Sequence, residues 1–205
     1  MSINKHPLHA LAAYLPSNSF EHVVQYLHQF KVHLTITRER KSVLGNYRNA
    51  TRSKNHRISI NGNLNPYSFL ITLLHELAHL LTYEQYGNRV QAHGKEWKQV
   101  YAQVLAIFLT KNIFPKEIVN ALQKSLHNPA ASSCAEDDLM RVLRMYDKKA
   151  GDTMLIEELA LQELFITKDG RTFERGEKLR KRYRCKEIKT GSTYLFSPVY
   201  EVKKC

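Results

Sequence analysis

The chain has 205 residues, 43% of them hydrophobic, which is enough for one packed domain, with or without a small appendage, and argues against wholesale disorder. Its 31 Lys and Arg outnumber 19 Asp and Glu, and the net charge of +12 favours acidic or polyanionic partners without bearing on the fold. Three cysteines, odd in number and far apart, are typical of free thiols in a reducing compartment. Because the start lacks a signal-peptide pattern and no apolar stretch is long enough to cross a bilayer, we expect a cytoplasmic protein without membrane contact.

The N-terminal part of the chain is expected to contain two helices followed by three short strands. Apolar spacing predicts helices over residues 4–14 and 18–30. Alternating apolar side chains then predict strands within residues 31–39, 42–50 and 56–64. We expect these strands to pair in chain order as a small antiparallel meander.

The next helix has clear sequence signals at both ends. Asn65 is a favourable N-cap, Pro66 fits the first helical position and Gly87 fits the position just after the end. Between these signals the sequence is the most apolar of the chain. A long, largely buried helix is therefore predicted here.

Three further helices are expected before the pattern changes. One begins after Gly94, another at Pro115, and a third at Ser133, whose Ser-x-x-Glu spacing to Glu136 is a capping-box signature. Gly151 is expected to end this helical region. We therefore predict a first domain over residues 1–151.

Residues 152–205 are expected to form a separate, basic, β-rich module. Short strands are predicted at "LFIT", "RYRCKEI", "TYLFS" and "VYEV", with turns at "KDG" and "KTGS". The fold class is therefore predicted to be α+β. The expected core of the module consists of Leu164, Ile166, Phe173, Tyr183, Leu195, Phe196 and Val199.

Three ionisable side chains interrupt the apolar central helix, and they point to a metal site. His75 and His79 are four residues apart, so both lie on one face of a helix, where two imidazoles can bind one Zn²⁺. Glu76 would project beside the metal, where it can hold a water. This is the His-Glu-x-x-His arrangement of zinc peptidases, in which the glutamate is the general base.

A catalytic zinc needs a third protein ligand, and His93 is the best candidate. Eight helical residues carry the chain about 12 Å beyond His79, and six extended residues after Gly87 can return roughly 20 Å. His93 can therefore reach the metal. Glu84 is an alternative, but it lies on the same rigid helix, a turn or more beyond His79. The other histidines, His56 among them, are expected to be surface or capping residues.

"HELAH" followed after a short turn by "HGKEW" resembles the SprT-like zinc metallopeptidases, the spartan-related family. The resemblance covers roughly residues 20–110, including Trp97 at the family's aromatic position. It implies that His75, His79 and His93 bind zinc and that Glu76 is the general base.

The resemblance also implies a minimal zincin-like fold. In that fold a small antiparallel sheet lies above the metal-bearing helix, and the edge of the sheet can bind an extended peptide. We expect "HRISING" to be this edge strand. One departure is clear: many relatives end in a zinc ribbon with paired Cys-x-x-Cys, whereas this C-terminus offers Cys185 without a pair, so a second, structural zinc is not expected.

The leading hypothesis is a zinc-dependent endopeptidase, and the relatives suggest proteins attached to DNA as its substrates. The alternative is a nucleic-acid-binding or adaptor protein on a metallopeptidase scaffold, which would not need Glu76. Two basic clusters could contact DNA phosphates. The first is Arg38, Arg40, Lys41, Arg48, Arg52, Lys54 and Arg57; the second is Lys178, Arg180, Lys181, Arg182 and Arg184, with Tyr183 placed to stack on a base.

Overall fold

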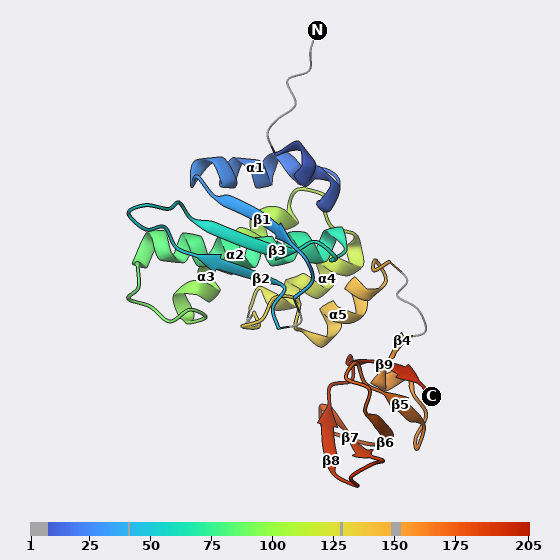
Figure 1. Cartoon of the computed structure of the whole chain (residues 1–205). Helices are drawn as coiled ribbons and strands as arrows, with labels where there is room; N and C mark the ends of the chain where they lie inside the picture. Colours follow the sequence, from blue (N-terminus) through green and yellow to red (C-terminus); the bar gives the residue numbers. More distant parts are fainter. Residues whose placement is uncertain (1–7, 41, 128, 149–152) are drawn as a thin grey trace. The chain divides into compact units, whose positions relative to one another are not determined.

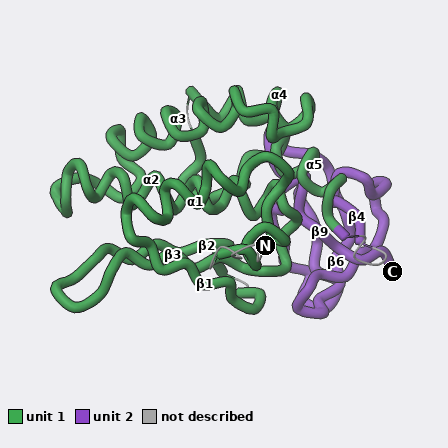
Figure 2. Tube along the Cα trace, turned by 90° about the horizontal axis from the view of Figure 1, so that it is seen from above, with its two compact units in different colours: residues 1–147 green, residues 148–205 purple. Residues whose placement is uncertain are grey.

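The computed structural model describes residues 8–40, 42–127, 129–148 and 153–205. The chain divides into two compact units, residues 1–147 and 148–205, which Figure 2 distinguishes by colour. Each unit has its own hydrophobic core. The boundary expected after residue 151 lies outside the described residues. In the described ranges, no helix has the length and apolar character needed to cross a membrane.

The first unit combines helices with one small sheet (Figure 1). Its elements are η1 (His9–Tyr14), α1 (Phe20–Gln29), β1 (His33–Thr37), β2 (Gly45–Arg48), β3 (Arg57–Asn61), α2 (Pro66–Tyr86), α3 (Lys95–Leu109), α4 (Lys116–Ser125) and α5 (Asp137–Arg144). The predicted α+β class is confirmed. The first part of the helix expected from residue 4 lies outside the described residues.

The strand order of this sheet differs from the expected meander. The order is β1-β3-β2, with β1 parallel and β2 antiparallel to β3. The expectation that "HRISING" forms an edge was therefore wrong, because both edges of β3 are paired. Burial explains the order: Ile58 and Ile60 of β3 are 1% and 0% exposed, as expected of a central strand. The free edges belong to β1 and β2.

Helix α2 is the buried axis of the first unit. The Asn65 side chain accepts a hydrogen bond from the Ser68 amide at 2.9 Å, and Gly87 ends the helix with φ of 61°. Both predicted caps are confirmed. One face of the sheet, with Tyr47 and Ile58 as a cross-strand pair, packs on α2. The helix is therefore enclosed on almost every side, which explains its continuous apolar sequence.

The last helix of the first unit begins later than expected. Helix α5 starts at Asp137, and Glu136 is its N-cap. The capping box from Ser133 does not form, because the Glu136 carboxylate accepts instead from the Ala130 amide at 3.1 Å. Cys134 has φ of 57°, which a helix cannot contain. Residues 131–133 are thus a loop, and this loop has a place in the candidate site.

The second unit is a six-stranded antiparallel sheet in the order β4-β9-β5-β6-β7-β8. Its elements are β4 (Thr153–Leu155), η2 (Ile156–Glu158), β5 (Leu164–Ile166), β6 (Thr172–Leu179), β7 (Arg182–Glu187), β8 (Thr193–Phe196) and β9 (Glu201–Lys204). Strand β6 was not predicted, because its many charged residues leave no clear alternation of apolar and polar side chains. The two expected turns are present, with Gly170 and Gly191 at φ of 82° and 73°.

The core of the second unit follows a different register from the one expected. Phe173, Tyr183 and Val199 are buried as predicted, but Leu164 and Leu195 are 39% and 53% exposed. The other buried residues of this core are Ile156, Leu159, Phe165, Cys185 and Val202. Tyr183 is 6% exposed, with Arg175 and Lys178 over its ring, so it cannot stack on a nucleotide base as expected.

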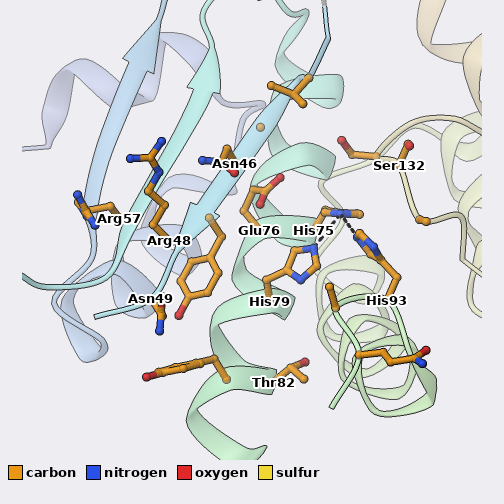
Figure 3. Close-up of a pocket in the computed structure, with 18 of the residues that line it drawn as sticks. Asn46, Arg48, Asn49, Arg57, His75, Glu76, His79, Thr82, His93 and Ser132 are labelled. Carbon is orange, nitrogen blue, oxygen red and sulfur yellow. Dashed lines mark hydrogen bonds between the residues drawn. The ribbon is translucent and has the colours of Figure 1, made fainter. Parts of the chain in front are cut away.

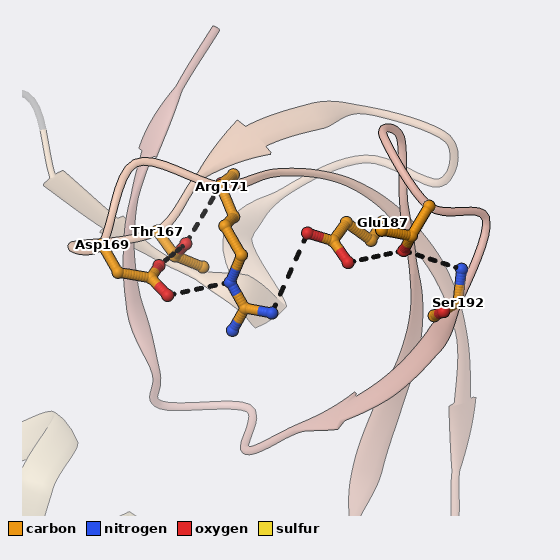
Figure 4. A network of polar contacts seen from close by, with 6 residues as sticks. Thr167, Asp169, Arg171, Glu187 and Ser192 are labelled. Atoms are coloured by element: carbon orange, nitrogen blue, oxygen red, sulfur yellow. Dashed lines mark hydrogen bonds and ion pairs between the residues drawn. The ribbon is translucent and has the colours of Figure 1, made fainter.

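A polar network closes the turns of the second unit (Figure 4). The Arg171 guanidinium donates to Asp169 at 2.8 Å and lies 3.9 Å from the buried Glu187 carboxylate. The Thr167 hydroxyl also contacts Asp169. The Glu187 carboxylate accepts a hydrogen bond from the Thr190 hydroxyl at 2.6 Å, and that hydroxyl accepts one from the Ser192 amide at 3.2 Å. An ion pair between Arg171 and Glu187 thus joins the two neighbouring turns, and hydrogen bonds hold each turn internally.

Candidate metal centre

Three imidazoles from two elements meet at one point of the first unit (Figure 3). His75 and His79 lie one turn apart on α2, and His93 comes from the loop just before α3. The Nε2 atom of His75 is 3.3 Å from Nε2 of His79 and 3.3 Å from Nε2 of His93. The structure therefore brings together the three histidines that the sequence singled out as ligands.

This spacing fits a zinc ion. Two nitrogens bound tetrahedrally at about 2.0–2.1 Å from zinc lie roughly 3.3 Å apart. Burial, with a smaller contribution from the neighbouring imidazoles, lowers the pKa of His75 to about 3 and that of His79 to about 4. The rings are consequently neutral at physiological pH, with lone pairs available to a cation.

Trp97 forms a rigid floor beneath the three rings. Its centroid lies 4.7 Å from that of His75, 5.1 Å from His79 and 4.7 Å from His93. The indole is fully buried and stacks on Tyr101 with an interplanar angle of 9°. The sequence identified Trp97 as a helix-core residue, but not its contact with all three imidazoles.

Glu76 lies between the imidazole cluster and strand β2 (Figure 3). Burial raises its pKa to about 7, while a hydrogen bond from the Tyr47 backbone amide and the charge of Arg40 act in the opposite direction. Gly45 allows β2 to approach, because a Cβ there would lie 2.7 Å from both Glu76 Oε1 and Thr72 Cγ2. The carboxylate is thus held at one point beside the cluster.

The cluster opens into a cleft of about 920 Å³. One wall is β2 with the residues before it, the floor is α2, and the loop 87–93 closes one side. The opposite wall is residues 131–133, and Ser132 lies on the side of the cleft away from β2 (Figure 3). Sequence reasoning placed this segment at a helix start and so missed its contribution to the cleft.

Glu84, the alternative third ligand, does not join the cluster. Its carboxylate lies 3.2 Å from Nε2 of His56 instead. His56 itself is 7% exposed, so the expectation of a surface or capping residue was wrong. The alternation of the strand places His56 on the same face as the buried Ile58 and Ile60, a signal that could have marked it as buried. Among the described residues, the three histidines are the one group of three or more metal-ligand side chains close enough to share an ion.

The model of the SprT-like family matches residues 13–118, about half of the chain, and this segment contains all three histidines and Glu76. The chain belongs to the SprT-like family. This family is metallopeptidase-like and generally associated with zinc.

Curated relatives match over short segments. Protein SprT of Glaesserella parasuis is 61% identical over 33 residues, which are 16% of this chain and 20% of the relative. Protein SprT of Vibrio parahaemolyticus is 52% identical over 44 residues, covering 21% and 26%. The chain thus aligns with about a fifth to a quarter of the length of these relatives. No solved structure gives a significant match.

Proposed function

We propose that this protein is a zinc-dependent endopeptidase. The observation that carries the proposal is the meeting of three neutral imidazoles with a buried carboxylate at the floor of an open cleft. Three histidine ligands leave one position of a tetrahedral zinc open, which is the property of a catalytic site. A structural zinc site would be closed, and a scaffold used only for binding has no need for Glu76.

The chain's own residues supply the proton transfers of hydrolysis. When bound, zinc lowers the pKa of water and polarises the scissile carbonyl. Glu76 accepts the proton of the attacking water and passes it to the leaving amine. Its raised pKa suits both steps, because a group that titrates near neutral pH can accept and release a proton.

Strand β2 is the edge along which we expect the substrate to bind, in place of "HRISING". The Asn61 amide donates to the Leu44 carbonyl at 2.9 Å, so the antiparallel alternation directs the backbone groups of Gly45 and Tyr47 away from β3. An extended peptide can pair with the Gly45 groups and the Tyr47 carbonyl inside the cleft, whereas the Tyr47 amide already donates to Glu76. Pairing through the backbone depends little on the side chains of the peptide, so we expect the protein to cleave substrates of many different sequences.

Metal analysis tests this proposal. The purified protein should hold one zinc per chain, and His75→Ala, His79→Ala and His93→Ala should each lower occupancy at least about tenfold. Glu84→Ala is the matched control, because Glu84 is an acidic side chain on the same helix outside the cluster. Full zinc retention after loss of any one of the three histidines would contradict the site.

We further propose that substrates include proteins bound to nucleic acid. The face of the first sheet directed away from α2 carries a cross-strand row of His33, Arg57 and Arg48. Arg48 is exposed, and the Nε atom of Arg57 is buried without a hydrogen-bond partner. The directly opposite Arg48 and Arg57 carry like charges, which is unfavourable in a sheet, and phosphates would relieve this repulsion.

The first basic cluster is smaller than expected. The Arg40 guanidinium donates hydrogen bonds to Asn61 at 2.8 Å and to Ser59 at 3.0 Å. It therefore holds the loop before β2 against β3 and is not available to bind a phosphate. Lys41 lies outside the described residues. In the second cluster, Arg182 and Arg184 are exposed on β7 and remain candidates.

A salt titration with labelled single-stranded and double-stranded DNA tests the nucleic-acid partner. The slope of log affinity against log salt is negative. Each lost phosphate contact should make it less steep by about 0.9 on duplex DNA or about 0.7 on single strands. We expect this reduction for Arg48→Ala and Arg57→Ala. Lys111→Ala, which removes a charge two residues after the end of α3, is the control. Unchanged slopes would refute binding by this face and leave the peptidase proposal intact.

A further inference from the structure

A buried histidine outside the metal cluster joins strand β2 to helix α2. The Tyr47 hydroxyl lies 2.9 Å from Nδ1 of His56, and the Ala50 amide nitrogen lies 3.2 Å from the same atom. On the opposite side of the ring, Nε2 lies 3.2 Å from a carboxylate oxygen of Glu84. The imidazole therefore bridges the edge strand of the cleft and the helix that carries the metal site.

These contacts define the tautomer of His56. A backbone amide can only donate, so Nδ1 accepts from Ala50 and carries no proton. The Tyr47 hydroxyl must then donate to the same nitrogen. Burial, with the Glu84 charge, raises the pKa of Tyr47, which keeps the phenol protonated. The ring proton is left on Nε2, where it donates to Glu84.

Tyr47 carries this connection to the catalytic glutamate. Its backbone amide donates to the Glu76 carboxylate, while its hydroxyl donates to His56. The Tyr47 ring stacks on the imidazole, with centroids 5.9 Å apart and planes inclined by 19°. Tyr83 packs edge-on against the same imidazole, with ring centroids 6.0 Å apart. A shift of β2 along α2 would therefore break the contacts to His56 and to Glu76 together.

We propose that His56 is a positioning residue of the cleft. As the neutral Nε2–H tautomer, it links Glu84 to the Tyr47 hydroxyl and thereby holds the Tyr47 amide against Glu76. His56 is not among the residues that line the cleft, so it acts through Tyr47. The catalytic consequence rests on the proposed peptidase function, whereas the structural link between β2 and α2 does not.

The link is tested first without any activity measurement. Nitrogen-15 NMR of the zinc-loaded full chain should show His56 protonated at Nε2 and unprotonated at Nδ1. Hydrogen exchange of the Tyr47 amide should become at least about tenfold faster in Tyr47→Phe and in His56→Ala. In His56→Asn, whose amide oxygen replaces Nδ1 as an acceptor, the Tyr47 amide should exchange more slowly than in His56→Ala. Tyr26→Phe, the same deletion on α1, is the control.

Kinetics then test the effect on catalysis. Zinc content should be unchanged in all variants, while kcat of Tyr47→Phe and His56→Ala falls about tenfold, since a small misplacement of a reacting group is costly. KM should change less than twofold. A His56 proton on Nδ1, or Tyr47 amide exchange unchanged in folded Tyr47→Phe, would overturn the inference. A wild-type protein that hydrolyses nothing would instead contradict the proposed function, and the NMR result would still decide the link.

Discussion

At the residue scale, the structure accounts for the ionisable groups inside the most apolar helix. His75 and Glu76 are 4% and 5% exposed. Burying polar groups without partners costs several kcal/mol. Burial lowers the pKa of His75 and raises that of Glu76, so it disfavours the charged form of both groups. A bound cation would offset this cost through coordination by the neutral rings.

Zinc should therefore stabilise the fold. At free zinc a thousandfold above its dissociation constant, the free energy of unfolding should rise by about 4 kcal/mol, provided that the unfolded chain does not bind the ion. Thermal unfolding with zinc and with a chelator measures the difference. His79→Ala should abolish most of the increment, and His127→Ala, which removes a histidine distant from α2 in the sequence, should retain it. An equal increment in both variants would contradict the site.

The cysteines allow a second test at this scale. Burial raises the pKa of Cys134 to about 12 and also raises that of Cys185, so at pH 8 both side chains remain thiols, the unreactive form. Cys205 is exposed. Alkylation of the native protein at pH 8 should label Cys205 first, and Cys134 and Cys185 only after unfolding, as read by mass spectrometry. Rapid labelling of Cys134 in the folded state would show that the loop 131–133 is not packed as described.

At the scale of elements, the closeness of β2 to α2 sets the geometry of the cleft. Gly45 faces Thr72 and Glu76 with no space for a side chain. The strand could not otherwise bring the Tyr47 amide to the carboxylate. One small residue thus couples the sheet edge to the general base.

Gly45→Ala tests this coupling. The added methyl group should displace β2 or Glu76, destabilise the protein by about 1–3 kcal/mol and reduce kcat, while zinc content stays unchanged. Thr35→Ala, on the exposed face of β1, is the control. Chemical denaturation, metal analysis and peptide hydrolysis are the measurements. A Gly45→Ala protein with wild-type stability and activity would show that the close approach is not needed.

The sequence predicted the helices of the first unit better than its strands. Asn65, Pro66 and Gly87 act locally, so their pattern was sufficient to define α2. The order β1-β3-β2 depends on contacts between distant segments, and the apolar alternation of each strand does not reveal its neighbour. Ser133 shows the same limit, since the Ala130 amide competes for Glu136.

In the candidate site, too, local features could be predicted from the sequence and tertiary contacts could not. The helical spacing of His75 and His79 predicted that they share a face. His93 was a candidate because the chain after Gly87 is long enough to return to the metal. The structure brings all three together. The role of His56 could not be predicted, because its partners come from two other segments, residues 47–50 and helix α2. The wall at residues 131–133 likewise depends on tertiary packing.

At the scale of the whole molecule, the two units have separate cores. The first core contains α2 and the candidate site, and the second is the small aromatic core of residues 153–205. The family match ends at residue 118, so the second unit, helix α5 and most of helix α4 lie beyond the matched segment. All residues of the metal cluster belong to the first unit.

A chain truncated after residue 147 should fold and bind one zinc with unchanged affinity, because no ligand is removed. Circular dichroism and zinc competition measure these properties, with His79→Ala in the truncated chain as the negative control. If nucleic acid contacts β7, the truncation should also reduce the salt slope of DNA affinity. Loss of zinc binding on truncation would show that the second unit is needed to form the site.

The most direct test of the peptidase proposal is hydrolysis by Glu76→Gln. The wild-type protein and Glu76→Gln, each loaded with one zinc per chain, are incubated with an unstructured protein substrate, and new N-termini are counted by mass spectrometry. The wild type should cleave, and Glu76→Gln should retain zinc but lose at least about a hundredfold in rate, because the amide cannot accept the proton. Wild-type activity in zinc-loaded Glu76→Gln, or no cleavage by the zinc-loaded wild type, would contradict the proposed mechanism.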